Sequence, residues 1–154
     1  MSLNLHLESF NYIIRSTNKT LAGDSHAACS IRLQCPSLYK YYECEIVGFY
    51  LGYTGTKTDV YTSGFLELRS DNFTFVDFGS DTGNKRVVAV QTTSNFYNQQ
   101  IQKFKVANFN GVTINFSIVG DDGLPLSYLA AGVGQPVAYN KPWILILNMK
   151  GSNE

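Results

Sequence analysis

Apolar and polar residues alternate along several short stretches of the chain. Residues 3–7 place three leucines on one side and Asn4 and His6 on the other, and residues 112–119 alternate without interruption. This period of two residues is typical of β-strands that bury one face and expose the other. Apolar residues recur at helical spacing over three turns nowhere in the sequence, so the pattern predicts an all-β chain.

The alternating stretches are separated by turns rich in Gly, Pro, Asn and Asp. Residues 110–111 (NG) and 120–123 (GDDG) give the strongest turn signals. Residues 124–140 contain two prolines and two glycines, and we expect most of them to be irregular. Strands are expected over residues 3–7 (with 10–14 as an extension or a second strand), 28–34, 39–53, 60–68, 86–92, 101–106, 112–119 and 142–149.

Two of these expected strands depart from simple alternation. Residues 39–53 contain Gly48 and Gly52, which in a strand indicate a bulge or a close approach by another backbone. Residues 142–149 (PWILILNM) are apolar on both faces, so we expect this strand to be central in its sheet or covered by a partner.

About eight strands separated by turns predict a single antiparallel β-sandwich, jelly-roll-like, over residues 1–150. Residues 151–154 (GSNE) are expected to form a disordered tail. No internal repeat is visible, which argues against a propeller or a solenoid.

Composition and charge limit the classes of partner. The 12 Lys and Arg residues balance the 12 Asp and Glu residues, so the formal net charge is zero. Phosphate binding needs a basic excess, so this balance argues against nucleic acid and leaves little repulsion between copies of the chain. The apolar runs are far shorter than the roughly 20 residues of a membrane-spanning helix. The N-terminus lacks the basic start and apolar block of a secretory signal.

The cysteines do not form a recognisable metal or disulfide pattern. Cys29, Cys35 and Cys44 are an odd number of thiols, and their spacing matches no usual zinc site. We expect them to be reduced and buried as small apolar residues. His26, three residues before Cys29, leaves half a metal site or a thiol–imidazole pair as the alternative.

Two pairs of carboxylates are the other candidates for chemistry. Glu43 and Glu45 share one face of an expected strand, about 7 Å apart at the usual strand rise, which suits acid–base catalysis but is also typical of a solvated strand face. Asp121 and Asp122 could help to bind calcium, although a simple turn explains them as well.

Tyrosines are unusually dense between residues 39 and 53. Aromatic rings with polar tips suit a protein interface or stacking on sugars, but tyrosines also pack along sandwich strands with their hydroxyl groups in water. The candidate interface or ligand-stacking residues are Tyr39, Tyr41, Tyr50, Tyr53 and Trp143.

The C-terminal 40 or so residues resemble virus-encoded jelly-roll proteins of the capsid, spike or fibre-head type, as found in large DNA viruses and virophages. The resemblance depends on an Asn-, Thr-, Ser- and aromatic-rich composition, the turn at 121–123 (DDG), the loop at 124–126 (LPL) and the closing strand at 142–147 (PWILIL). A small tumour-necrosis-factor-like trimer would look similar. The resemblance implies a shell or assembly role with no catalytic residues, and a location in a virion or the host cytoplasm.

Three functions remain open at this point. The first is a non-enzymatic structural or interaction protein, a self-associating domain whose partners are copies of itself (a trimer, for example) or other capsid proteins. The second is a carbohydrate-binding module that uses surface tyrosines, with calcium near Asp121 and Asp122. The third is a small enzyme, which would need His26, cysteine or glutamate groups to converge in one pocket. We expect the first, and therefore no metal, no cofactor, no nucleic acid and no membrane.

Overall fold

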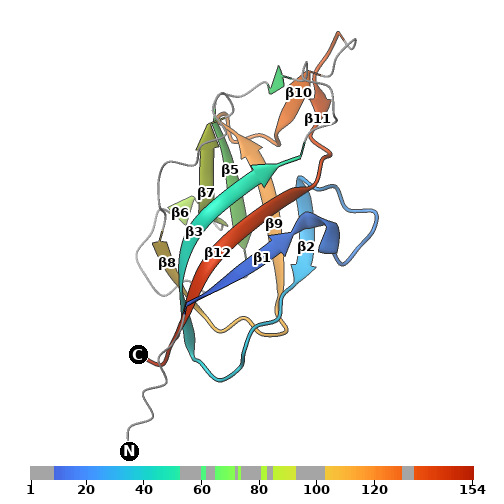
Figure 1. Cartoon of the computed structure of the whole chain (residues 1–154). Coiled ribbons are helices and arrows are strands. Elements are labelled where there is room, and N and C mark those ends of the chain that lie inside the picture. The colour runs from blue at the N-terminus through green and yellow to red at the C-terminus, as the bar shows by residue number, and fades with distance from the viewer. Residues whose placement is uncertain are drawn as a thin grey trace, which may run out of the picture.

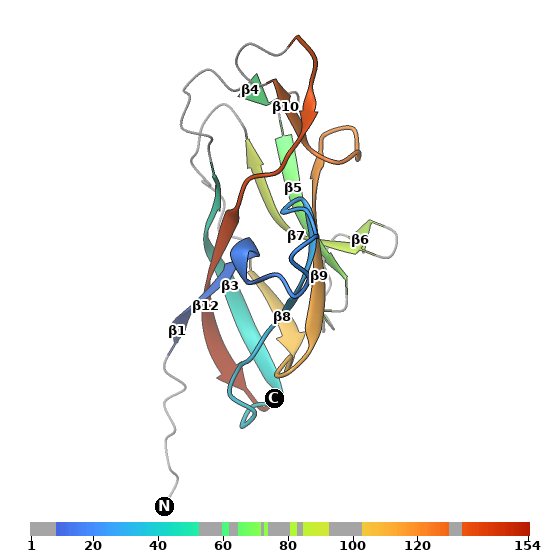
Figure 2. The same cartoon turned by 90° about the vertical axis from the view of Figure 1, so that its right-hand side faces the viewer.

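The structure, a computed structural model, describes residues 9–52, 60–61, 65–71, 73, 81–82, 85–92, 103–129 and 134–154. Two antiparallel sheets face each other across one core (Figures 1 and 2). The helical content of these residues is one 3-10 turn, η1 (Ser16–Asn18). The prediction of an all-β sandwich is confirmed.

Sheet A has four strands, and sheet B has five. Sheet A has the order β1 (Phe10–Arg15), β12 (Trp143–Ser152), β3 (Tyr41–Leu51) and β8 (Lys103–Ala107). Sheet B has the order β2 (Ala28–Arg32), β9 (Thr113–Gly120), β5 (Phe65–Asp71), β7 (Lys85–Thr92) and β6 (Asp81–Thr82). A small end sheet joins β11 (Val137–Ala138), β10 (Ser127–Leu129) and β4 (Val60–Tyr61).

The longer strands cross between the two sheets along the chain, except that the consecutive strands β5 and β7 pair within sheet B. β1, β3, β8 and β12 lie in sheet A, whereas β2, β5, β7 and β9 lie in sheet B. The first strand pairs with the last, with Phe10 opposite Met149 and Arg15 opposite Ile144. This repeated crossing between layers is the connectivity of a jelly roll, so the predicted topology of about eight main strands agrees with the structure.

The inward-facing side chains of both sheets form one aromatic-rich core. The ring of Trp143 lies 5.4 Å from that of Phe116 and 6.0 Å from that of Phe49, both edge-on. Phe73 continues the cluster, 6.1 Å from Phe116 and 5.3 Å from Phe109. Edge-to-face contacts at these distances add to the stability that burial provides, so the core joins the two sheets firmly.

Both glycines singled out in the long aromatic strand have the predicted roles. The pairing of β3 with β12 shifts between Ile146 and Leu147, so Val47 is an extra residue beside Gly48 at a β-bulge. Gly52 lies against the backbone of Pro142, and its N–H donates to the Pro142 carbonyl at 2.7 Å. The two turn predictions are also confirmed, because Gly111 and Gly123 have φ angles of 74° and 77°.

Three sequence-based expectations differ from the structure or lie outside it. The C-terminal tail is not disordered from residue 151, because β12 continues through Ser152 and the Asn153 side chain accepts a hydrogen bond from the Lys40 N–H at 3.0 Å. Within residues 124–140, most of which we expect to be irregular, the structure has the short strands β10 and β11, which the sequence did not predict. The strand expected over residues 3–7 lies outside the described residues.

Candidate interaction surface

The outward side chains of sheet A are set by the alternation and register of its strands. In the central pair, Ile144 lies opposite Tyr50, Ile146 opposite Gly48, Asn148 opposite Glu45, and Lys150 opposite Glu43. The outward residues of β1 and β8 extend these rows on either side. The outward side chains therefore form rows across the strands, and the rows change from apolar to charged along the length of the strands.

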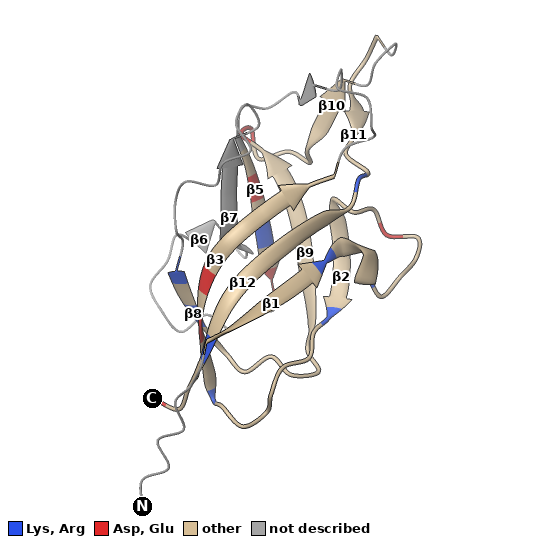
Figure 3. Cartoon of the chain, in the orientation of Figure 1, with Lys and Arg blue, Asp and Glu red and all other residues tan. Residues whose placement is uncertain are grey.

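One half of the outer face is mostly apolar, with Arg15 of β1 beside Ile144 at its margin. We call Ile13, Val47, Tyr50, Ile144 and Ile146 the apolar patch. Val47 is 53% exposed, Tyr50 49% and Ile13 46%, and the two isoleucines of β12 are half-buried. Figure 3 shows that this part of β3 and β12 carries no charged residue. Exposed apolar side chains that adjoin one another on a flat sheet are typical of a surface that a partner covers.

The bulge shapes the centre of the apolar patch. It leaves Val47 as an additional outward residue beside Ile146. The ring of Tyr50 covers Gly48, where a Cβ atom would come within 2.5 Å of the ring carbon Cε2. The absence of a side chain at Gly48 thus allows the Tyr50 ring to lie over the sheet.

The other half of the outer face is charged, in two rows across three strands. One row is Lys150, Glu43 and Lys105, and the next is Asn148, Glu45 and Lys103. A shallow pocket of about 450 Å³ lies among these residues. The acidic residues are all on β3 and the basic ones on its two neighbours, so the charges form columns along the strands (Figure 3).

The ion pairs within this half are loose. Lys103 Nζ lies 3.9 Å from Glu45 Oε2, and both side chains are well exposed. Lys105 Nζ lies 5.0 Å from the centre of the Tyr41 ring and donates to the Glu154 carbonyl. Exposed pairs of this kind contribute little to folding, about 0–1 kcal/mol, so the charges remain available to a partner.

The predicted aromatic site residues separate into different environments. Tyr41 and Tyr50 lie on the outer face, and Tyr53 lies outside the described residues. Tyr39 is half-buried, with its ring 5.9 Å from Tyr42. Trp143 is 1% exposed in the core, so its prediction as a surface contact is wrong.

Sequence reasoning did not name the four aliphatic residues of the apolar patch. The alternation of side chains along β12 could have identified two of them. Ile144 and Ile146 lie on the same strand face as Asn148 and Lys150, whereas Trp143 lies on the opposite face. The expectation that this strand would be central is confirmed, since β12 lies between β1 and β3.

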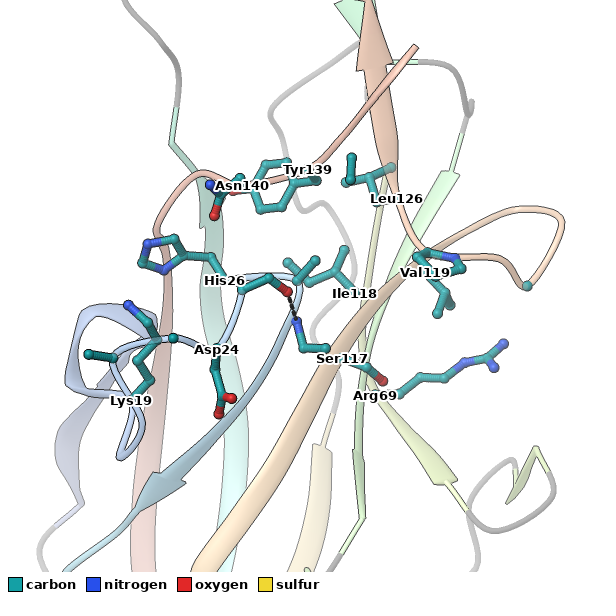
Figure 4. Close-up of a pocket in the computed structure, with 18 residues that line it drawn as sticks. Lys19, Asp24, His26, Arg69, Ser117, Ile118, Val119, Leu126, Tyr139 and Asn140 are labelled. Atoms are coloured by element: carbon teal, nitrogen blue, oxygen red, sulfur yellow. Dashed lines mark hydrogen bonds between the residues drawn. The ribbon is translucent and has the colours of Figure 1, made fainter.

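A second cavity, of about 980 Å³, lies between the loop that precedes β2 and sheet B (Figure 4). The loop that precedes β2 contributes Lys19, Asp24 and His26 to its wall, and sheet B contributes Arg69 and Ser117. Arg69 is already held by Glu67, at 2.7 Å. The cavity is open and mixed in charge, and it brings His26 together with neither a cysteine nor a glutamate among the described residues.

His26 has a structural partner at the edge of this cavity. Its Nδ1 atom lies 2.9 Å from the hydroxyl of Ser16, a wholly buried residue of η1. The same hydroxyl oxygen accepts a hydrogen bond from the Trp143 N–H at 2.8 Å, and Trp143 Nε1 donates to the His26 carbonyl at 2.6 Å. Because burial removes water and Lys19 lies nearby, the pKa of His26 is lowered. The serine thus holds three segments together and is inaccessible as a nucleophile.

The remaining candidate catalytic groups do not meet His26. Glu43, Cys44 and Glu45 line the separate shallow pocket on sheet A. Cys29, Cys35 and Cys44 are all buried and none forms a disulfide. Burial raises the pKa of Cys29 to about 11 and also raises that of Cys35, so both thiols stay protonated near neutral pH. Asp122 Oδ1 accepts a hydrogen bond from the Leu124 N–H at 2.9 Å, which is a turn contact.

The part of the chain that the structure describes contains no group of three or more His, Cys, Asp or Glu residues placed to hold a metal ion. Nor do these residues include a helix with the length and apolar character needed to cross a bilayer.

Comparisons with known proteins do not indicate a function, so the function is inferred from the outer face of sheet A. No match was found among protein-family models, curated proteins or solved structures. The resemblance to viral jelly-roll proteins therefore stays a prediction.

Proposed function

We propose that this protein is a non-enzymatic structural protein that self-associates through the outer face of sheet A. The observation that carries the proposal is the apolar patch, whose five side chains adjoin one another over the bulge of β3 and the central strand β12. Covering half-exposed Val, Ile and Tyr side chains contributes roughly 1 kcal/mol each, which favours a partner of matching flatness. The zero net charge leaves little long-range repulsion between copies.

The surroundings of the apolar patch also fit a protein partner. Apolar area at the centre with charged residues at its margin is the usual anatomy of a protein interface. The charged rows of Glu43 and Glu45 with Lys103, Lys105 and Lys150 provide both signs of charge beside the patch. A second copy presents the same two signs and the same flat apolar area.

Two matched valine substitutions test the proposal. Val47→Lys places a charge in the apolar patch, whereas Val112→Lys makes the same change at a turn away from sheet A, where Val112 is 37% exposed. Burying an unpaired ammonium costs several kcal/mol, so Val47→Lys should weaken self-association at least ~100-fold, or about 3 kcal/mol. Val112→Lys should associate like the wild type when mass is measured by light scattering across a concentration series.

The pair of variants also gives a clear negative result. If Val47→Lys keeps the wild-type mass at every concentration, the outer face of sheet A is not the interface. If the wild type itself has the mass of one 17.1-kDa chain throughout, the proposal of self-association fails.

Carbohydrate binding is the second candidate, and the environment of Tyr50 favours it. Its ring remains 49% exposed above Gly48, whereas Lys105 lies over the ring of Tyr41. An exposed tyrosine ring is suited to stacking on a sugar. Glycan-array binding that is lost in Tyr50→Ala and kept in Tyr41→Ala would support this role, and the absence of binding by the wild type would discard it.

A further inference from the structure

We infer that two copies pair face to face about a two-fold axis that runs parallel to the strands of sheet A, between β12 and β3. The inference rests on the proposed function and specifies its partner and geometry. It follows from the rows of the outer face, in which Lys150 lies beside Glu43 and Ile146 beside Gly48.

An axis in this position exchanges the two central strands. Each outward residue of β12 then lies over its row neighbour on β3 of the second copy, and the reverse contact occurs by symmetry. Lys150 faces Glu43 of the second copy, and Glu43 faces its Lys150. Ile144 faces Tyr50, and Ile146 faces the Val47–Gly48 bulge, so apolar groups meet apolar groups, while Glu45 faces the amide of Asn148.

An axis above either central strand produces repulsion. An axis above β12 would place Lys150 on Lys150, and an axis above β3 would place Glu43 on Glu43, with no opposite charge on the same strand to relieve them. An axis between β3 and β8 would pair Glu43 with Lys105, but β12 would then lie beyond the edge of the second copy and Ile144 and Ile146 would stay uncovered.

An axis across the strands fails for a different reason. At the middle of the sheet it would place the charged rows on the apolar patch of the second copy, which desolvates Glu43, Glu45 and Lys150 without partners. Moved to the centre of the apolar patch, it would leave the charged half of each copy uncovered. The parallel axis between β12 and β3 is the arrangement that satisfies both halves.

The area of the face is sufficient for such a pair. Four strands about 4.8 Å apart, with lengths from 5 to 11 residues, give a flat area of roughly 500 Å², of the same order as the ~800 Å² per partner of a standard interface. Sheets that pack in the aligned manner keep their strands within about 30° of each other, so the row contacts near the axis survive the twist of the sheets.

A charge exchange between separate chains tests this geometry. Glu43→Lys alone and Lys150→Glu alone should each weaken self-association about tenfold or more at low salt, because like charges then meet twice across the axis. In a 1:1 mixture, the new lysine of one chain faces the new glutamate of the other, while the native Lys150 and Glu43 face each other. The mixture should therefore recover near-wild-type association as a mixed pair.

Association in the mixture distinguishes charge contacts between two chains from charge contacts within one chain. Each variant also loses the Lys150–Glu43 neighbour on its own sheet, and mixing cannot restore that neighbour. An affinity tag on one variant identifies mixed pairs by co-purification of the other. Glu43→Lys mixed with wild type is the control, and it should recover only in part because one of the two contacts stays repulsive.

Three results would overturn the geometry. The first is a mixture that associates no better than the variants alone, the second is a mixed pair that forms no more often than a random half, and the third is a wild type with the mass of a trimer. A trimeric wild type that Val47→Lys dissociates would leave the proposed function standing and remove only the two-fold pairing.

Discussion

Ser16 is a polar residue buried without access to solvent, and its hydroxyl joins three segments of the chain. It accepts from the Trp143 N–H at 2.8 Å and lies 2.9 Å from His26 Nδ1. Trp143 in turn donates to the His26 carbonyl through its indole N–H. A buried donor that loses its acceptor is costly, so this small network is expected to govern the local stability of η1 and the start of β12.

Ser16→Ala tests that expectation. The substitution leaves the Trp143 N–H without its acceptor and should lower the free energy of unfolding by about 1–3 kcal/mol. Ser30→Ala is the matched control: it removes the exposed 2.6 Å hydrogen bond from Ser30 to Asn115, and should cost less than about 1 kcal/mol. Urea unfolding at equal protein concentration compares them, and equal losses would contradict the role assigned to Ser16.

His26 gives the molecule a specific pH dependence. Its pKa in the folded state lies below the ordinary value of 6.5, because burial and then Lys19 disfavour the charged ring. The unfolded chain therefore takes up a proton near pH 6.5, before the folded chain does. This contribution to stability is complete above pH 6.5 and is lost as the pH falls from there toward the folded-state pKa.

His26→Asn should flatten the decline in unfolding free energy between pH 7.5 and pH 5. His6→Asn changes the chain's other histidine and serves as the control, in which the decline should persist. A decline that disappears in His6→Asn and remains in His26→Asn would show that His6, and not His26, causes the pH dependence of stability.

At the level of strands, two glycines determine how β3 meets its neighbours. Gly48 accommodates the ring of Tyr50 at the bulge, and Gly52 accommodates the backbone of Pro142. The two glycines differ in how easily their neighbour could make room for a Cβ atom. The exposed ring of Tyr50 beside Gly48 can rotate aside, whereas the Pro142 carbonyl beside Gly52 cannot move without displacing the start of β12.

Gly52→Ala should therefore destabilise the fold. Its Cβ would lie 2.6 Å from the Pro142 carbonyl oxygen, and relief of such a contact costs about 1–3 kcal/mol. Gly23→Ala is the control, because nothing lies within 4 Å of that Cβ position and the change should be neutral or slightly stabilising. Thermal unfolding distinguishes the two, and a stable Gly52→Ala protein would show that β3 and β12 can separate at this point.

Strands and turns were largely predictable from the sequence, because their signals are local. Alternation located most of the long strands, and Gly111 and Gly123 occupy the left-handed conformations that the turn sequences predicted. The pairing of Phe10 with Met149 was not predictable, since the two residues are far apart in sequence and no local pattern encodes their register. The end of β12 was missed because Gly151 and Ser152 are typical of turns, yet Gly151 fits beneath the ring of Tyr39.

At the scale of the whole molecule, the interaction surface depends on the register of distant strands. The sequence drew attention to tyrosines and to the single tryptophan, but Trp143 belongs to the inward face of a strand that is apolar on both faces. Only Asn148 and Lys150 indicated which face of that strand is outward. The alignment of Lys150 with Glu43, and of Ile13 with Ile146, exists only after β1, β12 and β3 have come together.

Sedimentation equilibrium of the wild-type protein over a wide concentration range shows whether a second copy of the chain covers the outer face of sheet A. We predict a mass that rises with concentration to twice that of the 17.1-kDa chain. A mass that stays at 17.1 kDa at the highest concentration would contradict the proposed self-association.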